Sequence, residues 1–488
     1  MPNPFIDQLF NENNSELQDI HDIRLKNLAE MNVGGGVSVV GYDSVNDKFG
    51  LIAFSTITGG VAWFGRRWRK GNASVVGEPV GDLDLGRAFA KTIGLGGYLV
   101  TNAHAREKLS PTNHNYKDNG AAADLTGASG HYQWGWNVPM YYQVYEDSTF
   151  LYETFSIGGP RKGYWNQYIP IGSRSCAGYA QMDRTNSILK SSVNNTDQYR
   201  GGNNTNWDGT WRSLLGKPCT NLSVQTMRTA ARQNGTLWFV NERCMQYVTA
   251  ALKRVIFGNR NIQAAYNAEL DAYGLLQGGT GVGADYPSSW TSGRGYNPYL
   301  DLSVGVDQGD KVGLISADIV EESGSLTINN IPCFYGLKND YKYLWCMCEN
   351  MLLQCNANGS QSLFISNTID GTSMNLDSVS GLTQIATGPT NSGWVYAKEY
   401  TLQNLAFFPK AELGGSTSTY FCDGYYNPGS TSGLRGAFLL GPAGYGGYAG
   451  SLSLGGSDGP SYTHADYGGF LCEWAEPFTS APIWVEEN

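Results

Sequence analysis

The sequence predicts an α+β protein in which a few helices pack on an irregular antiparallel sheet. Three observations lead to this fold class. A chain of 488 residues exceeds what one ordinary core accommodates, so two or three domains are expected. Short β-like segments recur along most of the chain between glycines, asparagines and aspartates. Only two long helical patterns are convincing, and they are adjacent, at 220–235 and 237–258.

The composition is typical of a loop-rich β protein with large uncharged surfaces. Charged residues make up 16% of the chain, against a usual share of about 25%, whereas glycine reaches 63 residues and tyrosine 30. The formal net charge of -10 repels nucleic-acid phosphates over long range. We therefore expect no nucleic-acid partner.

One basic cluster stands out in the stretch WFGRRWRKG. Arg66, Arg67, Arg69 and Lys70 alternate there with tryptophans, a composition that also suits stacking on single-stranded nucleic acid. We interpret the cluster as a solvated edge strand whose charges prevent aggregation.

No segment indicates export or a membrane span. The stretch MPNPFIDQLFNENN lacks a basic region followed by an apolar one, and nowhere do 18 apolar residues follow one another. Nine cysteines form an odd set, which without a secretion signal predicts reduced thiols in a protein made in a cytosol. We expect no membrane insertion.

Residues 1–33 are interpreted as an anchoring segment. Residues 15–31 have a helical pattern with a narrow apolar stripe, which must pack on the chain's own body, on copies of itself or on another protein. The apolar-studded peptide ahead of it suits a groove on another protein, and a plain domain-docking helix is the alternative. The candidate anchoring residues are Phe5, Ile6, Leu9, Phe10, Leu17, Ile20 and Leu28.

Two further domains are expected behind this segment. Residues 34–130 contain short β-like pieces broken by glycine, asparagine and aspartate, which predict a small β-rich domain. Residues 131–488 contain the pair of helices, the second of which ends at Gly258. Beyond about 312 the β pattern resumes, with Trp394 and Tyr396 alternating with smaller residues.

No complete catalytic or metal-binding motif is recognisable. The chain has five scattered histidines and no HExxH, GxSxG or P-loop motif. Cys346, Cys348 and Cys355 lack the remaining ligands of a zinc site and are interpreted as buried strand residues. Acidic pairs such as Asp82 and Asp84 would suit a glycosidase only at the right separation, which sequence does not give. We expect no cofactor and no metal, and nominate no catalytic residue.

The helical region resembles a set of phage appendage proteins from gut bacteria. In those proteins an Arg-x-x-Ala-Arg-x-x-Gly helix precedes a second helix that ends near Gly-x-x-x-x-Gln. The matching positions are Arg228, Ala231, Arg232, Gly235, Gly258 and Gln263.

The C-terminal region is similar to the last strands of the C-type-lectin-like fold of phage receptor-binding proteins, some of which a retroelement diversifies. The similarity rests on Arg435-Gly436, 444–450 and 468–474, and with earlier segments it extends over about 131–488. It implies a lectin-like domain with two helices packed on an irregular antiparallel sheet, behind the small β-rich domain and the N-terminal helix. The calcium-binding turn of animal lectins is not matched, because Glu476-Pro-Phe478 stands where an acid or amide would follow the proline.

The resemblance implies a non-enzymatic structural protein on the virion surface, made in the cytoplasm of the bacterial host. Its N-terminal segment would bind another virion protein, and family likeness implies a homotrimer. The resemblance is compatible with a head fibre and with a tail fibre. The alternatives are a capsid decoration protein without a receptor, or an enzyme on the same fold, either a glycan depolymerase or a formylglycine-type oxidase.

The expected binding face lies in tyrosine-, serine- and glycine-rich turns near the C-terminus and would contact a host-surface glycan or protein. Tyrosine, serine, asparagine and glycine combine rigid contact area with adaptable hydrogen bonds, as in antibody paratopes. The alternative is that these residues fill contacts between subunits. The candidates are Tyr425, Tyr426, Asn427, Tyr445, Tyr448, Ser461, Tyr462 and His464. Two closing strands, around 448–454 and 467–474, are expected to flank the last three.

Overall fold

The computed structural model describes residues 61–202, 213–287, 298–321 and 324–487, and the backbone of a separate antiparallel hairpin, β1 (Ser38–Asp43) and β2 (Lys48–Ala53). The candidate anchoring residues from Phe5 to Leu28 and the helix expected at 15–31 lie outside the described residues.

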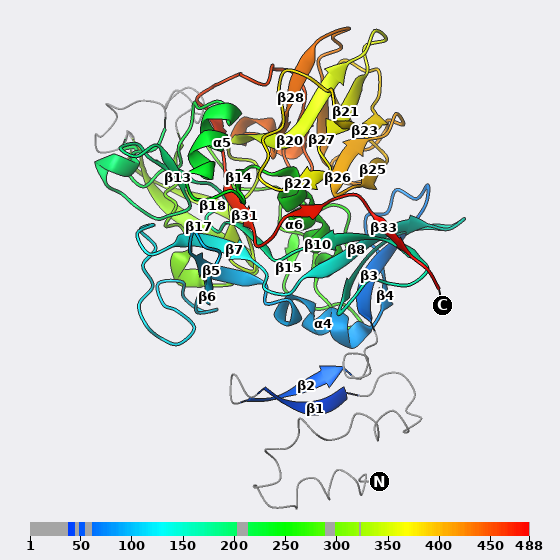
Figure 1. Cartoon of the computed structure of the whole chain (residues 1–488), viewed down its shortest axis with the longest axis horizontal. Coiled ribbons are helices and arrows are strands. Elements are labelled where there is room, and N and C mark those ends of the chain that lie inside the picture. The colour runs from blue at the N-terminus through cyan, green and yellow to red at the C-terminus, as the bar shows by residue number, and fades with distance from the viewer. Residues whose placement is uncertain are drawn as a thin grey trace, which may run out of the picture.

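The described chain is mostly β, with one sheet curled into a half-barrel, so the predicted α+β, lectin-like arrangement of two helices on a sheet is wrong (Figure 1). Two six-stranded sheets and one eight-stranded sheet form its bulk. In Figure 1 the eight-stranded sheet lies above the two others.

The first six-stranded sheet has the order β33-β10-β8-β9-β3-β4, and the second has the order β14-β31-β11-β7-β5-β6. The first contains β33 (Ile483–Val485), β10 (Tyr164–Ile169), β8 (Met140–Glu146), β9 (Phe150–Ile157), β3 (Ala62–Arg69) and β4 (Glu78–Gly81). The second contains β14 (Trp238–Val240), β31 (Leu471–Trp474), β11 (Gly172–Ser175), β7 (His131–Gly135), β5 (Gly96–Val100) and β6 (Arg106–Lys108). Both sheets combine strands from before and after residue 130, so the expected domain boundary crosses two hydrogen-bonded sheets.

The eight-stranded sheet has the order β23-β21-β20-β28-β29-β27-β24, and the eighth strand, β30, pairs with β20. Its strands are β23 (Thr383–Thr387), β21 (Gln361–Ile365), β20 (Trp345–Cys355), β28 (Leu434–Leu439), β29 (Leu454–Gly455), β27 (Gly424–Asn427), β24 (Gly393–Tyr396) and β30 (Tyr467–Gly468). The three clustered cysteines are buried on β20, as predicted, and all nine cysteines are free thiols.

Smaller elements complete the described chain. The three-stranded sheet contains β17 (Gly313–Glu321), β18 (Gly324–Phe334) and β19 (Leu337–Lys338). The two-stranded sheets are β12 (Gln181–Asp183) with β13 (Ile188–Lys190), β15 (Tyr266–Asn267) with β16 (Gln277–Gly278), β22 (Thr368–Ile369) with β32 (Phe478–Thr479), and β25 (Tyr400–Gln403) with β26 (Ala406–Pro409). The helices are α4 (Leu83–Thr92), α5 (Val224–Arg232), α6 (Arg243–Phe257) and the 3-10 turns η2 (Asp197–Tyr199), η3 (Val306–Gln308) and η4 (Ala443–Tyr448).

Helix α6 lies at the centre of the molecule rather than on the outside of a sheet. Its end at Gly258 is confirmed, because this glycine adopts a left-handed conformation with φ 61°. All of its side chains are buried, and it contacts strands from all three large sheets as well as α4. The sequence pattern identified one apolar stripe, whereas the polar residues on the other faces are also enclosed. That enclosure is the physical reason why the predicted two-layer arrangement fails.

Buried ion pairs allow the polar side chains of α6 to be removed from solvent. The guanidinium of Arg254 donates to both carboxylate oxygens of Glu153 on β9, with a closest distance of 2.8 Å, and neither side chain is exposed. Burial alone would lower the pKa of Arg254, but the charge of Glu153 raises it. Arg243 instead donates to the carbonyls of 366, 404 and 405 and to Ser480.

The basic cluster on β3 is not a solvated edge strand. β3 lies between β9 and β4, and Arg66 is buried. Its Nε donates to the carbonyl of Val255 at 3.0 Å, near the C-terminal end of α6, where a positive charge complements the helix dipole. Burial lowers the pKa of Arg66 to about 10. Arg66 and Val255 are 189 positions apart in the chain, so the sequence could not show that the end of a helix would meet this strand.

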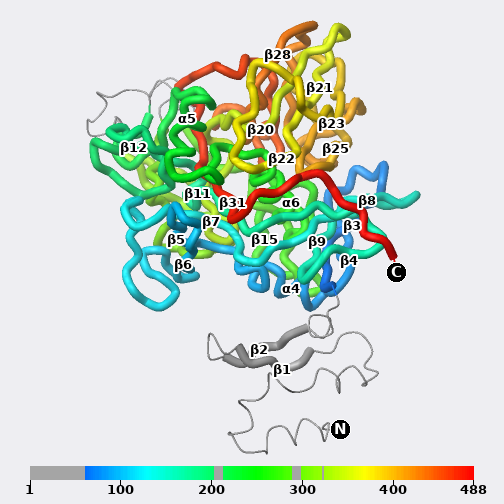
Figure 2. The backbone as a smooth tube through the Cα atoms, in the orientation of Figure 1, coloured from blue at the N-terminus to red at the C-terminus, as the bar shows by residue number. Residues whose placement is uncertain are grey.

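The C-terminal segment links the sheets (Figure 2). The red part of the tube passes from β31, between β14 and β11, to β33, which pairs with β10. The expected closing strand at 467–474 is present as β30 and β31. The one expected at 448–454 is wrong, because only Leu454 belongs to a strand and the preceding residues form η4 and turns.

We expect Glu153→Gln to destabilise the fold by about 3–5 kcal/mol, because it leaves the Arg254 charge buried without its counter-charge. The midpoint of denaturant-induced unfolding measures this loss. The control is Glu78→Gln, which breaks the exposed ion pair with Arg67 and is expected to cost less than about 1 kcal/mol. Equal effects of the two substitutions would contradict a central role for the buried pair.

Candidate functional site: an aromatic face

Five aromatic side chains gather at the edge of the eight-stranded sheet. We call Trp394, Tyr396, Tyr426, Tyr445 and Tyr448 the aromatic face. Strand β24 is the edge strand and pairs antiparallel with β27, with Trp394 opposite Tyr426. Alternation along β24 places Trp394 and Tyr396 on one side of the sheet.

The same alternation divides the residues predicted on β27. Tyr426 joins the aromatic face, with its ring centroid 5.4 Å from that of Trp394. Tyr425 and Asn427 point the other way and are buried, where Tyr425 donates to Gln361 at 2.8 Å and Asn427 donates to the carbonyl of Gly359 at 2.9 Å. The prediction that Tyr425 and Asn427 contact a receptor directly is therefore wrong. A strand cannot present three consecutive side chains on one face.

The turn η4 supplies the two remaining rings. Tyr448 stacks on Tyr396 with ring centroids 4.8 Å apart and planes 12° apart. It lies directly over Gly424, where an added Cβ would stand 2.8 Å from the tyrosine ring. Tyr445 is 41% exposed and lies 5.3 Å from Trp394. The absence of a side chain at Gly424 thus makes room for the stack.

The other predicted residues form a second exposed group. Ser461 and Tyr462 are exposed, and the Tyr462 ring lies 6.3 Å from that of His464. The Nδ1 of His464 lies 2.5 Å from Asp466, whose pKa is raised by burial.

Buried rings connect this group to the aromatic face. Tyr462 contacts Tyr467, which stacks on Phe438, and Phe438 contacts Trp345. Trp345 in turn stacks on Trp394 at 6.2 Å. One packed row of rings therefore supports both groups, a connection that the sequence did not reveal.

The aromatic face is suited to packing against a flat, uncharged ligand. Its rings provide rigid apolar area, and its tyrosines add hydroxyl groups that can form hydrogen bonds. Trp394 and Tyr396 were not among the predicted site residues. Their alternation in WVYAKEY was the available signal, but it indicated a strand without indicating which side would be exposed.

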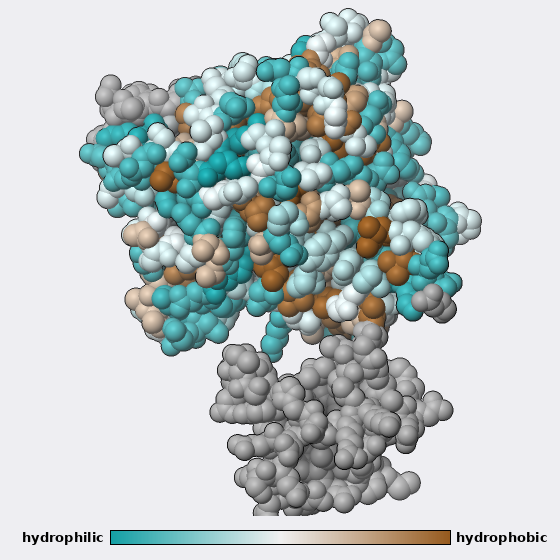
Figure 3. Space-filling view, in the orientation of Figure 1, coloured by the Kyte–Doolittle hydropathy of each residue, from teal (hydrophilic) through white to brown (hydrophobic). Residues whose placement is uncertain are grey.

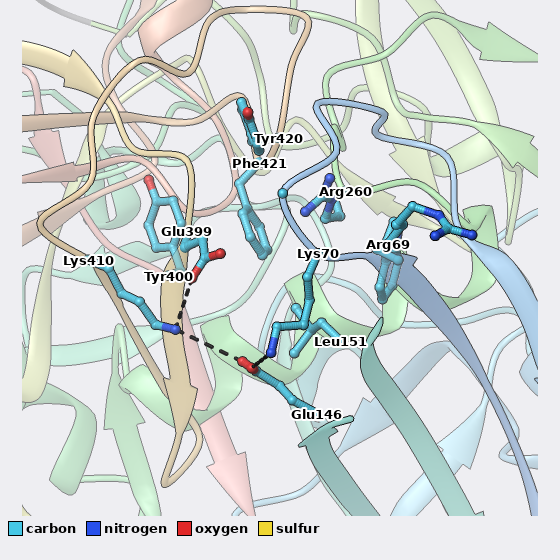
Figure 4. Close-up of a pocket in the computed structure, with 12 residues that line it drawn as sticks. Arg69, Lys70, Glu146, Leu151, Arg260, Glu399, Tyr400, Lys410, Tyr420 and Phe421 are labelled. Carbon is cyan, nitrogen blue, oxygen red and sulfur yellow. Dashed lines mark hydrogen bonds and ion pairs between the residues drawn. The ribbon is translucent and has the colours of Figure 1, made fainter. Parts of the chain in front are cut away.

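A groove opens between the first six-stranded sheet and the β23 and β25 region, with a volume of about 460 Å³. Figure 4 shows a smaller pocket next to it, where Glu146 lies between Lys70 and Lys410. Glu146 is 2.8 Å from Lys70 and 4.0 Å from Lys410, which also contacts Glu399 at 3.1 Å. The groove therefore has two carboxylates beside it, both engaged in ion pairs.

A Cys-His-Asp arrangement is enclosed elsewhere in the core. The Sγ of Cys176 lies 3.9 Å from Nδ1 of His114, whose Nε2 lies 2.9 Å from Asp310. Burial lowers the pKa of His114 to about 4 and raises that of Cys176. The thiol is therefore protonated and shielded from solvent, which is unfavourable for nucleophilic attack.

The acidic pair considered in the sequence has a local role. Asp82 caps α4 by accepting from the amides of Asp84 and Leu85, and Asp84 pairs with Arg87. Within the described ranges, no group of three or more histidines, cysteines, aspartates and glutamates is placed to hold a metal ion. The helices of these ranges also include none that is long and apolar enough to cross a membrane.

Compared with protein-family models, the chain matches none, and no curated protein sequence is significantly similar to it.

We expect Gly424→Ala to displace Tyr448 and to cost about 1–3 kcal/mol through overpacking. Near-ultraviolet circular dichroism reports the rearranged rings, and thermal unfolding reports the loss of stability. The matched control is Gly459→Ala, because an added Cβ at Gly459 meets nothing within 4 Å. An unchanged aromatic spectrum in Gly424→Ala would contradict the packing described for the face.

Proposed function

We propose that this protein is a bacteriophage virion component that binds the surface of the host cell, and that the aromatic face contacts a neutral saccharide there. The observation that carries the proposal is the packed set of partly exposed rings around Trp394. Rings that support one another lose little conformational freedom when a ligand packs on them.

A saccharide fits the chemistry of this face better than a charged ligand. One side of a pyranose ring presents C–H groups that pack on an aromatic ring, while its hydroxyl groups bond to tyrosine and serine hydroxyls. The net charge of -10 disfavours a polyanionic polymer over long range. The preferred ligand is therefore a neutral or weakly charged surface glycan.

The virion part of the proposal rests on the sequence resemblance of the 217–263 region to phage appendage proteins. In this proposal the segment 1–33 attaches the protein to another virion protein, and the assembled form is a homotrimer. Immunogold labelling of phage particles tests the location. Labelling of neither head nor tail would contradict it.

A second candidate function is cleavage of a glycan in the groove. Glu146 and Glu399 both contact Lys410 beside this groove, and paired carboxylates are the groups that most glycosidases use. New reducing ends released from host glycan by the wild type, but not by Glu146→Gln or Glu399→Gln, would favour this activity over binding alone.

We expect Trp394→Ala to weaken binding to host cells or their purified surface glycan by about 2 kcal/mol, or roughly 30-fold, because it removes the central ring. Pull-down on host cells or calorimetry with the glycan measures the loss. The matched control is Trp484→Ala, which removes a tryptophan that is 49% exposed on β33 of another sheet. Equal affinity of the two variants would contradict the proposed site.

A further inference from the structure

A lysine in the second half of α6 meets an aspartate in the interior. The Nζ of Lys253 lies 2.9 Å and 2.8 Å from the two carboxylate oxygens of Asp340, which follows β19. Their side chains are 0% and 1% exposed. The ring centroids of Tyr341 and Phe334 lie 5.0 Å and 5.7 Å from the same nitrogen. The hydroxyl of Ser451 also lies 3.4 Å from this nitrogen, so protein groups enclose the pair on the sides that these contacts describe.

Enclosure also affects the protonation of the lysine. Burial lowers the pKa of Lys253, although the charge of Asp340 opposes this shift.

We propose that Lys253 and Asp340 condense to form an intramolecular isopeptide bond. The burial of an ion pair in a low-dielectric interior carries a desolvation penalty that attraction only partly offsets. An amide has no net charge, so the condensation removes both charges from the interior. The enclosing rings also exclude the water that would reverse the reaction.

The reaction balances without any co-reactant. A proton passes from Lys253 to the carboxylate of Asp340, leaving a neutral amine and a neutral acid. The lone pair of Nζ attacks Cγ of Asp340, and the new Nζ–Cγ bond replaces one Cγ–O bond. A proton passes from the nitrogen to the departing hydroxyl, which leaves as water. No group is oxidised or reduced.

The cross-link would join α6 covalently to the connection between β19 and β20. Closing the loop between residues 253 and 340 restricts the unfolded chain in the same way as a disulfide. Unlike a disulfide, an amide bond is unaffected by reducing conditions. The nine thiols of this chain are all free, so such a bond would supply covalent reinforcement that they do not.

Mass spectrometry of the full-length wild-type protein tests the proposal. The expected mass is lower than the sequence mass by about 18 Da, one water. After denaturation and tryptic digestion, we expect no cleavage after Lys253 and a branched peptide that contains Lys253 and the segment 339–342. Cleavage after Lys253 with a free 339–342 peptide would overturn the proposal.

The same digest contains an internal control. Lys217 and Asp301 form an ion pair at 2.7 Å, but their side chains are 10% and 44% exposed. Hydration keeps these groups charged, so we expect no cross-link there. A loss of water at Lys217 and Asp301 to the same extent would overturn the role assigned to enclosure.

Discussion

The burial of α6 on all sides is the constraint on which the rest of the structure depends. A helix with basic residues in its second half cannot be enclosed unless each charge meets a partner. Glu153 on β9 and Asp340 after β19 provide these partners, and Arg66 on β3 donates to carbonyls near the helix end. The first six-stranded sheet and the connection after β19 are therefore held against this helix by directional contacts as well as by apolar packing.

The aromatic face benefits from this rigid interior. Its strands β24 and β27 belong to a sheet whose long strand β20 contacts α6. Buried rings such as Trp345 and Phe438 continue from the core to the half-buried Trp394 and the exposed Tyr445. A binding surface whose support is packed in this way is already organised before the ligand arrives.

Local features of the fold could be predicted from the sequence, and long-range ones could not. The glycine stop at Gly258 and the buried cysteines of β20 follow from local chemistry, and the structure confirms them. The enclosure of α6 depends on partners about 90 to 100 positions away, at Glu153 and Asp340, which periodicity does not reveal.

The candidate site was likewise predictable in its composition but not in the orientation of its side chains. Composition selected Tyr445 and Tyr448 as candidates, and the structure places both in the 3-10 turn η4 rather than in the strand expected from 448. The strand register decides which residues of 424–427 face outward, and the sequence does not show this register. The prediction therefore placed Tyr425 and Asn427 on the wrong side.

Amide hydrogen exchange, measured with and without purified host-surface glycan, tests most directly the central claim that the aromatic face binds a saccharide. The account predicts protection of amides in 393–396, 424–427 and 443–448, with none added in β10 and β33. Protection confined to other segments would contradict it.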